Sequence, residues 1–248
     1  MLQNDTNSEP EEFTTEDDIQ LPNSGFEDWY TDSDGLPKPA KDASSSFWDC
    51  GNVNYFGKHI MTTQNDETAL GEGSSVKMET QETMKIIAAG NIFTGTFERD
   101  GMGGILTLGR NFECRPNKLK GYYKYTSAKV SVSKGHLNEG EDDLCSLYIA
   151  LTDEQITVNT NKGIYFDPNS SAVIAYGSIS DEESKGADSF KEFTVDLEYK
   201  DLKRIPKYII VVASSSKYGD YMEGGKGSTM WLDDLELVYP KSMEEVRK

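Results

Sequence analysis

Three acidic residues near opposite ends of the chain have side chains suited to holding a cation. Glu27 lies in segment 21–29, LPNSGFEDW, and Asp233 and Asp234 lie in segment 227–239, GSTMWLDDLELVY. In a two-sheet β-sandwich the first and last strands commonly lie side by side, so distance along the sequence does not keep these carboxylates apart. Ca²⁺ takes six to eight oxygen ligands, carboxylates among them, and tolerates irregular geometry. The sequence therefore predicts a cation site formed by Glu27, Asp233 and Asp234.

The position of Asp233 in the last predicted strand supports this cation site. Alternate residues from Trp231 to Tyr239 share one face, and Asp233 is the only charged residue on it. An unpaired charge on an apolar face is costly to bury, and a cation would remove that cost. The alternative is that Asp233 is hydrated at the sheet edge or caps turn amides near Gly225.

The pattern of apolar residues predicts strands separated by turns. Residues from Phe193 to Tyr199 alternate between apolar and polar, as in a strand with one face in water. Segment 208–213, YIIVVA, is apolar on both parities, which is typical of a central strand covered on both faces. Further strands are predicted over residues 86–93, 105–108, 122–132, 144–151, 173–176 and 230–239. Without a βαβ rhythm, the pattern predicts an all-β fold, an antiparallel β-sandwich of the jelly-roll type.

The chain is expected to contain one folded region between two tails. Residues 1–20 carry seven acidic side chains, and no Lys or Arg occurs before Lys38, so we expect an acidic disordered tether. Residues 21–240 are predicted to form one sandwich, or two smaller ones that meet near residues 138–143. Residues 241–248 are expected to be a C-terminal tail. Helical periodicity is hard to find in the chain outside residues 242–248.

Composition excludes several functional classes. The formal net charge of −18 has the wrong sign for binding nucleic acid phosphates. No run of about 18 apolar residues occurs, so we expect no membrane span, and the chain as given carries no signal peptide pattern. The three cysteines, Cys50, Cys114 and Cys145, lack the C-x-x-C spacing of common zinc and redox sites. One disulfide and three reduced thiols both remain open.

Aromatic residues in loop-like stretches are the candidates for binding sugar. Pyranose rings pack their C–H faces on aromatic rings, and polar groups beside those rings orient the hydroxyls. Two of the candidate stretches are polar or glycine-rich, and Tyr123 and Tyr125 share one face of a predicted strand. Core packing is the alternative for Trp48, Tyr123 and Tyr125. The predicted carbohydrate-binding residues are Trp48, Asn52, Tyr55, Tyr123, Tyr125, Tyr218 and Tyr221.

Several segments in order resemble one known family. They are NSGFEDWY (23–30), FWDCGN (47–52), AAGNIFTGTF (88–97), RPNKLKGYYKY (115–125), ASSSKYGDY (213–221) and GSTMWLDDLELVY (227–239). Together they resemble the putative carbohydrate metabolism domain family over about residues 21–240. Its members are mostly surface lipoproteins of Gram-negative gut anaerobes.

The resemblance implies a jelly-roll sandwich similar to carbohydrate-binding modules of the galactose-binding-like type. Such modules often open with a G-F-E segment and close with a D-D segment that share a structural calcium. Those positions fall here on Glu27 and on Asp233 or Asp234. The resemblance also implies an exported protein at the cell surface or in the periplasm that takes part in polysaccharide utilisation. It supplies no established catalytic residue.

The leading hypothesis is a non-catalytic glycan-binding sandwich that presents polysaccharide to partner enzymes or transporters. Carbohydrate is then the main partner, together with other glycan-handling surface proteins. One alternative is a structural or adhesive surface module that contacts protein. The other is a glycoside hydrolase, which needs two carboxylates in one cleft. His59 and His136, the only histidines, are interpreted as solvated loop residues.

Overall fold

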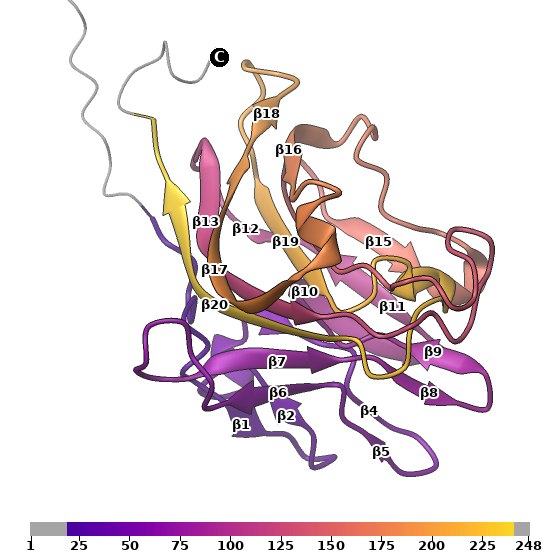
Figure 1. Cartoon of the computed structure of the whole chain (residues 1–248). Coiled ribbons are helices and arrows are strands. Elements are labelled where there is room, and N and C mark those ends of the chain that lie inside the picture. The colour runs from indigo at the N-terminus through magenta and orange to yellow at the C-terminus, as the bar shows by residue number, and fades with distance from the viewer. Residues whose placement is uncertain (1–18, 241–248) are drawn as a thin grey trace, which may run out of the picture.

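Alternating apolar and polar residues build two facing antiparallel sheets, as the sequence predicts. The computed structural model describes residues 19–240 (Figure 1). The larger sheet has the order β15, β11, β10, β19, β14, β16, β18, with β3 beside β10 and β12 beside β19. Its strands are β3 (Trp48–Asp49), β10 (Asn91–Asp100), β11 (Gly103–Leu108), β12 (Arg110–Asn111), β14 (Ser146–Thr152), β15 (Ile156–Asn159), β16 (Val173–Ser178), β18 (Glu198–Tyr199) and β19 (Tyr208–Ser214).

The smaller sheet has the order β17, β13, β20, β7, β6. Its strands are β6 (Thr62–Asn65), β7 (Ser75–Glu79), β13 (Lys118–Thr126), β17 (Ala187–Asp196) and β20 (Thr229–Val238). Three two-stranded ribbons pair β1 (Tyr30–Thr31) with β2 (Pro37–Lys38), β4 (Val53–Asn54) with β5 (Lys58–His59), and β8 (Gln81–Thr83) with β9 (Ile86–Ala88). Short 3₁₀ helices are η1 (Ala43–Ser45), η2 (Thr160–Lys162), η3 (Glu183–Lys185) and η4 (Gly219–Tyr221).

Strand β19 is buried on both faces, which confirms the prediction from its continuous apolar run. Ile209 and Val211 belong to the main core between the two sheets. Ile210 belongs to a second apolar cluster on the other face of the larger sheet. All three side chains are fully buried.

The first and last parts of the folded region are neighbours, as predicted. The backbone N–H of Leu235 in β20 donates to the carbonyl of Ser24 at 3.0 Å. The Gln20 side chain accepts from the N–H of Leu237 and donates to its carbonyl, each at 2.8 Å. Phe26 and Leu235 lie in the same core cluster. The N-terminal segment is therefore bonded along β20, although it forms no regular strand there.

The predicted alternation along β20 is wrong at Asp233, because a β-bulge interrupts it. The register against β13 shifts between Lys120 and Tyr122, and Asp234 has a left-handed φ of 47°. Because the bulge adds one residue to β20, the side chains that face the core are at even positions before it and at odd positions after it. Met230 and Leu232 face the core before the bulge, and Leu235 and Leu237 face it afterwards. The predicted alternation puts Trp231 on the same face as Leu235. In the structure Trp231 is instead half-buried under the ammonium groups of Lys77 and Lys124.

Two predicted strands have different limits. The predicted strand 86–93 is divided between β9 and β10. At Gly90, between them, the chain passes too close to neighbouring backbone atoms for a side chain to fit. A Cβ there would stand 2.3 Å from the Glu79 nitrogen. The predicted strand 122–132 ends at Thr126, and residues 128–143 instead form a short excursion closed by the Lys129–Asp142 bridge.

The larger and the smaller sheet share one main core cluster. The domain bounds 21–240 stay a prediction. The tether predicted over 1–20 falls almost wholly outside the described residues, as does the predicted tail 241–248. The cysteines form no disulfide, and Cys50 and Cys145 are buried. Within residues 19–240, no helix has the length and apolar character needed to cross a membrane.

Leu235 and its neighbour Glu236 test the register of β20 beyond the bulge. Leu235→Ala should lower the free energy of unfolding by about 2–5 kcal/mol, because it empties a packed core position. Glu236→Ala, at the exposed adjacent position, should change it by less than about 0.5 kcal/mol. Urea denaturation of both variants measures the difference. Equal effects would contradict the register described for β20.

Candidate functional site

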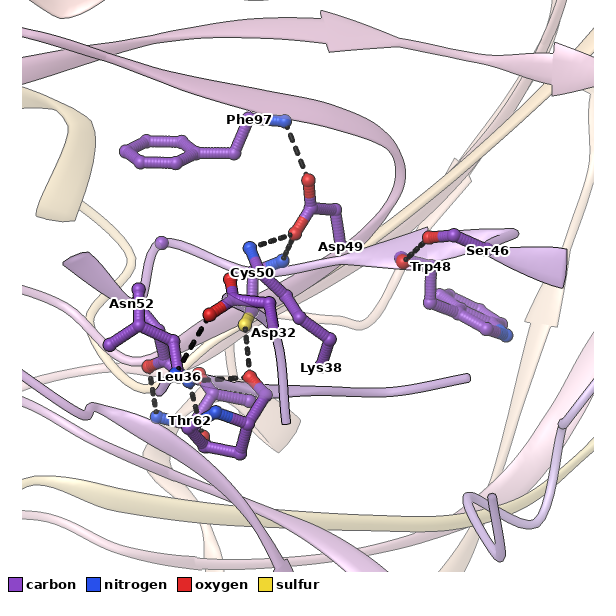
Figure 2. Close-up of polar contacts among 12 residues, drawn as sticks. Asp32, Leu36, Lys38, Ser46, Trp48, Asp49, Cys50, Asn52, Thr62 and Phe97 are labelled. Carbon is purple, nitrogen blue, oxygen red and sulfur yellow. Dashed lines mark hydrogen bonds and ion pairs between the residues drawn. The ribbon is translucent and has the colours of Figure 1, made fainter. Parts of the chain in front are cut away.

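Asp49 and Asn52 hold the base of the hairpin formed by β4 and β5. The Asp49 carboxylate accepts from the Phe97 N–H at 2.8 Å, the Cys50 N–H at 2.8 Å and the Lys38 ammonium at 2.7 Å. Figure 2 shows this carboxylate between Phe97 and the Cys50 backbone. The buried Asn52 side chain donates to the carbonyls of Pro37 and Thr62 and accepts from the N–H groups of Met61 and Thr62. These bonds fix where the hairpin leaves the sandwich.

The hairpin forms one wall of a groove of about 580 Å³. Two other hairpins line it as well, β8–β9 and β10–β11, and η4 contributes to its base. Each hairpin ends in a large apolar residue that lines the groove and is exposed to solvent. These residues are Phe56 (95% exposed), Met84 (83%) and Met102 (60%).

The tips of two hairpins hold these side chains in an unfavourable backbone conformation. Phe56 has φ of 52°, and Met84 and Lys85 have φ of 50° and 63°. The left-handed region costs residues other than glycine roughly 1–2 kcal/mol. The side chains of Phe56 and Met84 are mostly exposed, so they bury little apolar surface to offset this conformational cost. The stability of the free protein therefore does not explain why apolar residues occupy these two positions. Strained, exposed apolar residues around a groove indicate contact with a ligand.

Few polar groups line this largely apolar groove. The Arg99 guanidinium lies 4.3 Å from the ring centroid of Tyr55, whose ring also contacts Phe56 at 4.4 Å. His59, Gln81 and Asp220 contribute further polar atoms. Burial raises the pKa of the Asp220 carboxyl. Among the described residues that line the groove, Asp220 is the only carboxylate.

Four of the predicted sugar-binding residues lie in the core, so the prediction is wrong for them. Trp48 is fully buried, and its indole N–H donates to the Pro22 carbonyl at 2.7 Å. Tyr123 and Tyr125 point inward because their strand, β13, turns its odd positions toward the other sheet. Asn52 is fully engaged with backbone groups, as described above. No face of these four side chains is open to a sugar.

The other three predicted residues are half-buried, and their role remains a prediction. Tyr55 lines the groove. Tyr218 precedes η4 and Tyr221 is its last residue, and their rings contact the His136 ring at centroid distances of 4.4 Å and 4.3 Å. The Nδ1 atom of His136 lies 3.0 Å from the buried Glu223 carboxylate, so this histidine is packed rather than freely solvated.

Sequence reasoning missed Arg99, Met84, Met102 and Asp220. The ribbon β8–β9 turns through Met84 and Lys85, with none of the Asn-Gly or Asp-Gly signals of a two-residue hairpin. The prediction therefore missed β8 and merged β9 with β10. The available sequence signal for the groove was Met102, an apolar residue among the glycines of segment 101–104.

The three predicted cation ligands lie close together near the middle of β20. Asp233 is buried and accepts from the Ala69 N–H at 2.8 Å, and Glu27 accepts from the N–H of Ser74 at 3.0 Å. One oxygen of Asp234 and one of Glu27 lie 3.3 Å and 3.5 Å from where a Cβ on Gly25 would stand. A side chain on Gly25 would fill the space between them.

The charges of this acidic group disfavour one another. Burial first, and then the charges of Asp234 and Glu27, raise the pKa of Asp233 to about 6. Burial and the charge of Glu27 also raise the pKa of Asp234. Within residues 19–240, no three or more His, Cys, Asp or Glu side chains have the arrangement of metal ligands. A cation here would also need backbone carbonyl oxygens, which calcium accepts.

Comparison with known proteins identifies relatives. A family model described as "Putative carbohydrate metabolism domain" matches residues 21–238. A putative glycoside hydrolase from Bacteroides thetaiotaomicron is 25% identical, with a TM-score of 0.59 over 74% of this chain and 58% of its own. Another from Bacteroides vulgatus is 24% identical, with a TM-score of 0.58 over 72% of this chain and 77% of its own. This chain thus spans little more than half of the first structure. Curated proteins give no match.

Asp233 should make stability depend on pH. Its folded pKa of about 6 exceeds the unfolded value of about 3.9, so the folded state binds the proton more tightly. The resulting stabilisation is complete below about pH 4 and is lost as pH rises through 6. Relative to Asp233→Asn, the wild type should lose roughly 1–3 kcal/mol between pH 4 and 7. Urea denaturation across this range measures the difference, with the exposed Asp196→Asn as control. A constant difference would contradict the raised pKa.

Proposed function

Because the chain belongs to the putative carbohydrate metabolism domain family, we propose that it is a non-catalytic glycan-binding β-sandwich. In this proposal it is part of an exported protein at the cell surface or in the periplasm and presents polysaccharide to partner enzymes or transporters. The location rests on the family resemblance. Antibody labelling of intact cells that make the protein tests it, and signal confined to the cytoplasm would contradict it.

The groove between the three hairpins is the observation that carries glycan binding. Its volume of about 580 Å³ lies within the usual range of ligand sites, roughly 300–1,000 Å³. Tyr55 and Phe56 offer aromatic surface for sugar C–H faces. Arg99, Gln81 and Asp220 supply donors and acceptors for hydroxyl groups. Aromatic surface beside a few polar groups is the combination that sugar recognition requires.

The carboxylate content of the groove favours binding over hydrolysis. Glycoside hydrolases generally use two carboxylates on opposite sides of the scissile bond. Asp220 alone, among the described residues lining the groove, carries a carboxylate. The two Bacteroides structures are described as glycoside hydrolases, but this groove lacks the second acidic group that such a mechanism needs.

A protein-binding surface is the second candidate function. The apolar tips at Phe56, Met84 and Met102 would suit a protein contact as well as a glycan. Titration with glycans separates the two functions, because an adhesive surface has no reason to retain soluble polysaccharide.

Phe56→Gly should weaken glycan binding without loss of stability. Glycine adopts the left-handed conformation freely, and the Phe56 ring is almost fully exposed, so the free protein should be no less stable. Affinity for a polysaccharide found by glycan array should fall at least tenfold, about 1.4 kcal/mol. Tyr55→Ala should have an effect of similar size. Affinity electrophoresis and thermal melting measure the two quantities.

Ile205→Gly is the matched control, because Ile205 is another exposed apolar residue and does not line the groove. Its glycan affinity should equal that of the wild type. If Phe56→Gly and Tyr55→Ala both bind glycan like the wild type, the groove is not the binding site. If no polysaccharide binds the wild type, the glycan function fails.

We also propose that Glu27, Asp233 and Asp234 hold a structural calcium ion. The support is the space above Gly25 between two carboxylate oxygens and the buried Asp233 charge beside them. A bound cation would favour the ionised carboxylates and so stabilise the fold at neutral pH. Backbone carbonyls of the segment around Gly25 would complete the ligand set.

Calcium should therefore raise the melting temperature of chelator-treated protein by several degrees at pH 7. Magnesium should have a smaller effect, since it demands stricter octahedral geometry. The double variant Asp233→Asn, Asp234→Asn should show no calcium-dependent shift. Differential scanning fluorimetry measures all three. The same melting temperature with and without calcium in the wild type would rule out this site.

A further inference from the structure

Asp220 lines two cavities. One is the groove of about 580 Å³, and the other is a smaller inner cavity of about 60 Å³. Asn91, Leu106 and Asp220 line both of them. Asp220 belongs to η4, so the short helix places an acidic group between the base of the groove and the inner cavity.

Within residues 19–240, no hydrogen bond or ion pair engages the Asp220 side chain. Lys217 also lines the inner cavity, but its ammonium group is paired with Asp181 at 3.1 Å. Burial is the cause of the raised pKa of Asp220, with no neighbouring charge contributing. The residue as a whole is half-buried. A carboxylate that has lost part of its hydration gains from a hydrogen-bond donor. A ligand that brings a hydroxyl group would provide one.

The inner cavity suits a small uncharged group. Ser146 and Ser214 contribute hydroxyls, and Phe93 and Leu108 contribute apolar surface. A water molecule occupies about 30 Å³ in the liquid, so a cavity of about 60 Å³ has room for two or three heavy atoms. A hydroxymethyl group, the exocyclic arm of a hexose, has two.

We propose that Asp220 and the inner cavity form a subsite for the hydroxymethyl group of a neutral hexose and exclude a carboxylate at that position. This subsite rests on the proposed glycan function of the groove. The hexose hydroxyl donates to Asp220, while its carbon packs beside the apolar lining. A uronic acid carries a carboxylate at the same carbon, which has no proton to donate and is repelled by Asp220. The groove therefore selects neutral hexoses over uronates.

Matched oligosaccharides test this selectivity. Oligogalacturonate and oligoglucuronate are each compared with their carboxyl-reduced forms, which differ only in a hydroxymethyl group at the same carbon. The wild type should bind at least one reduced form tenfold or more tightly than its acidic parent at constant ionic strength. Asp220→Asn should weaken binding of that reduced form. The ratio of its affinity to that of the acidic parent should fall to about threefold or less. Isothermal titration calorimetry measures each affinity.

Two further variants make the test specific. Asp142→Asn removes the same charge from an exposed residue that lines neither cavity, so its preference should match the wild type. Ser146→Leu fills the inner cavity and leaves Asp220 intact, so it should also weaken binding of the reduced form at least fivefold. This second variant keeps the proposal testable if Asp220→Asn fails to fold.

Each outcome supports or overturns the subsite. If Asp220→Asn and Ser146→Leu keep the wild-type preference while Phe56→Gly loses binding, the subsite is wrong and the groove function stands. A wild type that binds other glycans but neither reduced probe also overturns the subsite. If the wild type binds no glycan of any kind, both the subsite and the proposed function fail.

Discussion

The burial of Trp48 is the constraint on which the rest of the structure depends. Its ring lies in the core against Phe26, with centroids 5.4 Å apart, and its N–H holds the Pro22 carbonyl. Its strand, β3, pairs with β10, with Trp48 opposite Thr94. One side chain thus ties the N-terminal segment to the larger sheet. That segment in turn bonds to β20, so the beginning and the end of the fold are joined through the same part of the core.

The same stretch of sequence carries the fold into the candidate site. Immediately after Trp48, Asp49 and Asn52 bond to backbone groups of β10 and of the segment leading into β6. Their bonds set the base of the β4–β5 hairpin, and the hairpin places Tyr55 and Phe56 over the groove. The tip can hold Phe56 in a strained conformation because its base is fixed. Residues that resemble a sugar-binding cluster in sequence thus support the groove from below.

The groove and the acidic group at Glu27 and Asp233 illustrate different uses of buried charge. Asp233 is buried beside the carboxylates of Glu27 and Asp234 and accepts from the backbone N–H of Ala69, and we propose that this group holds a cation. Asp220 stands alone between two cavities and suits a hydroxyl donor. Neither arrangement is the pair of carboxylates across a cleft that glycoside hydrolysis uses. The fold resembles proteins described as hydrolases, but function depends on the groups in the site rather than on the fold.

The sequence alone determined the sandwich class, the central position of β19 and the meeting of the two ends, because these follow from the period and polarity of the strands and from the family resemblance. It also singled out Tyr55, which lines the groove. Only the tertiary structure decided that Trp48 and Tyr123 face inward, since a period of two defines two faces but not which one meets the other sheet. The bulge at Asp234 likewise reverses the parity of β20. Segments distant in sequence surround Asp220. No local sequence pattern shows that, among the described residues, their packing leaves its carboxylate without a hydrogen-bond donor.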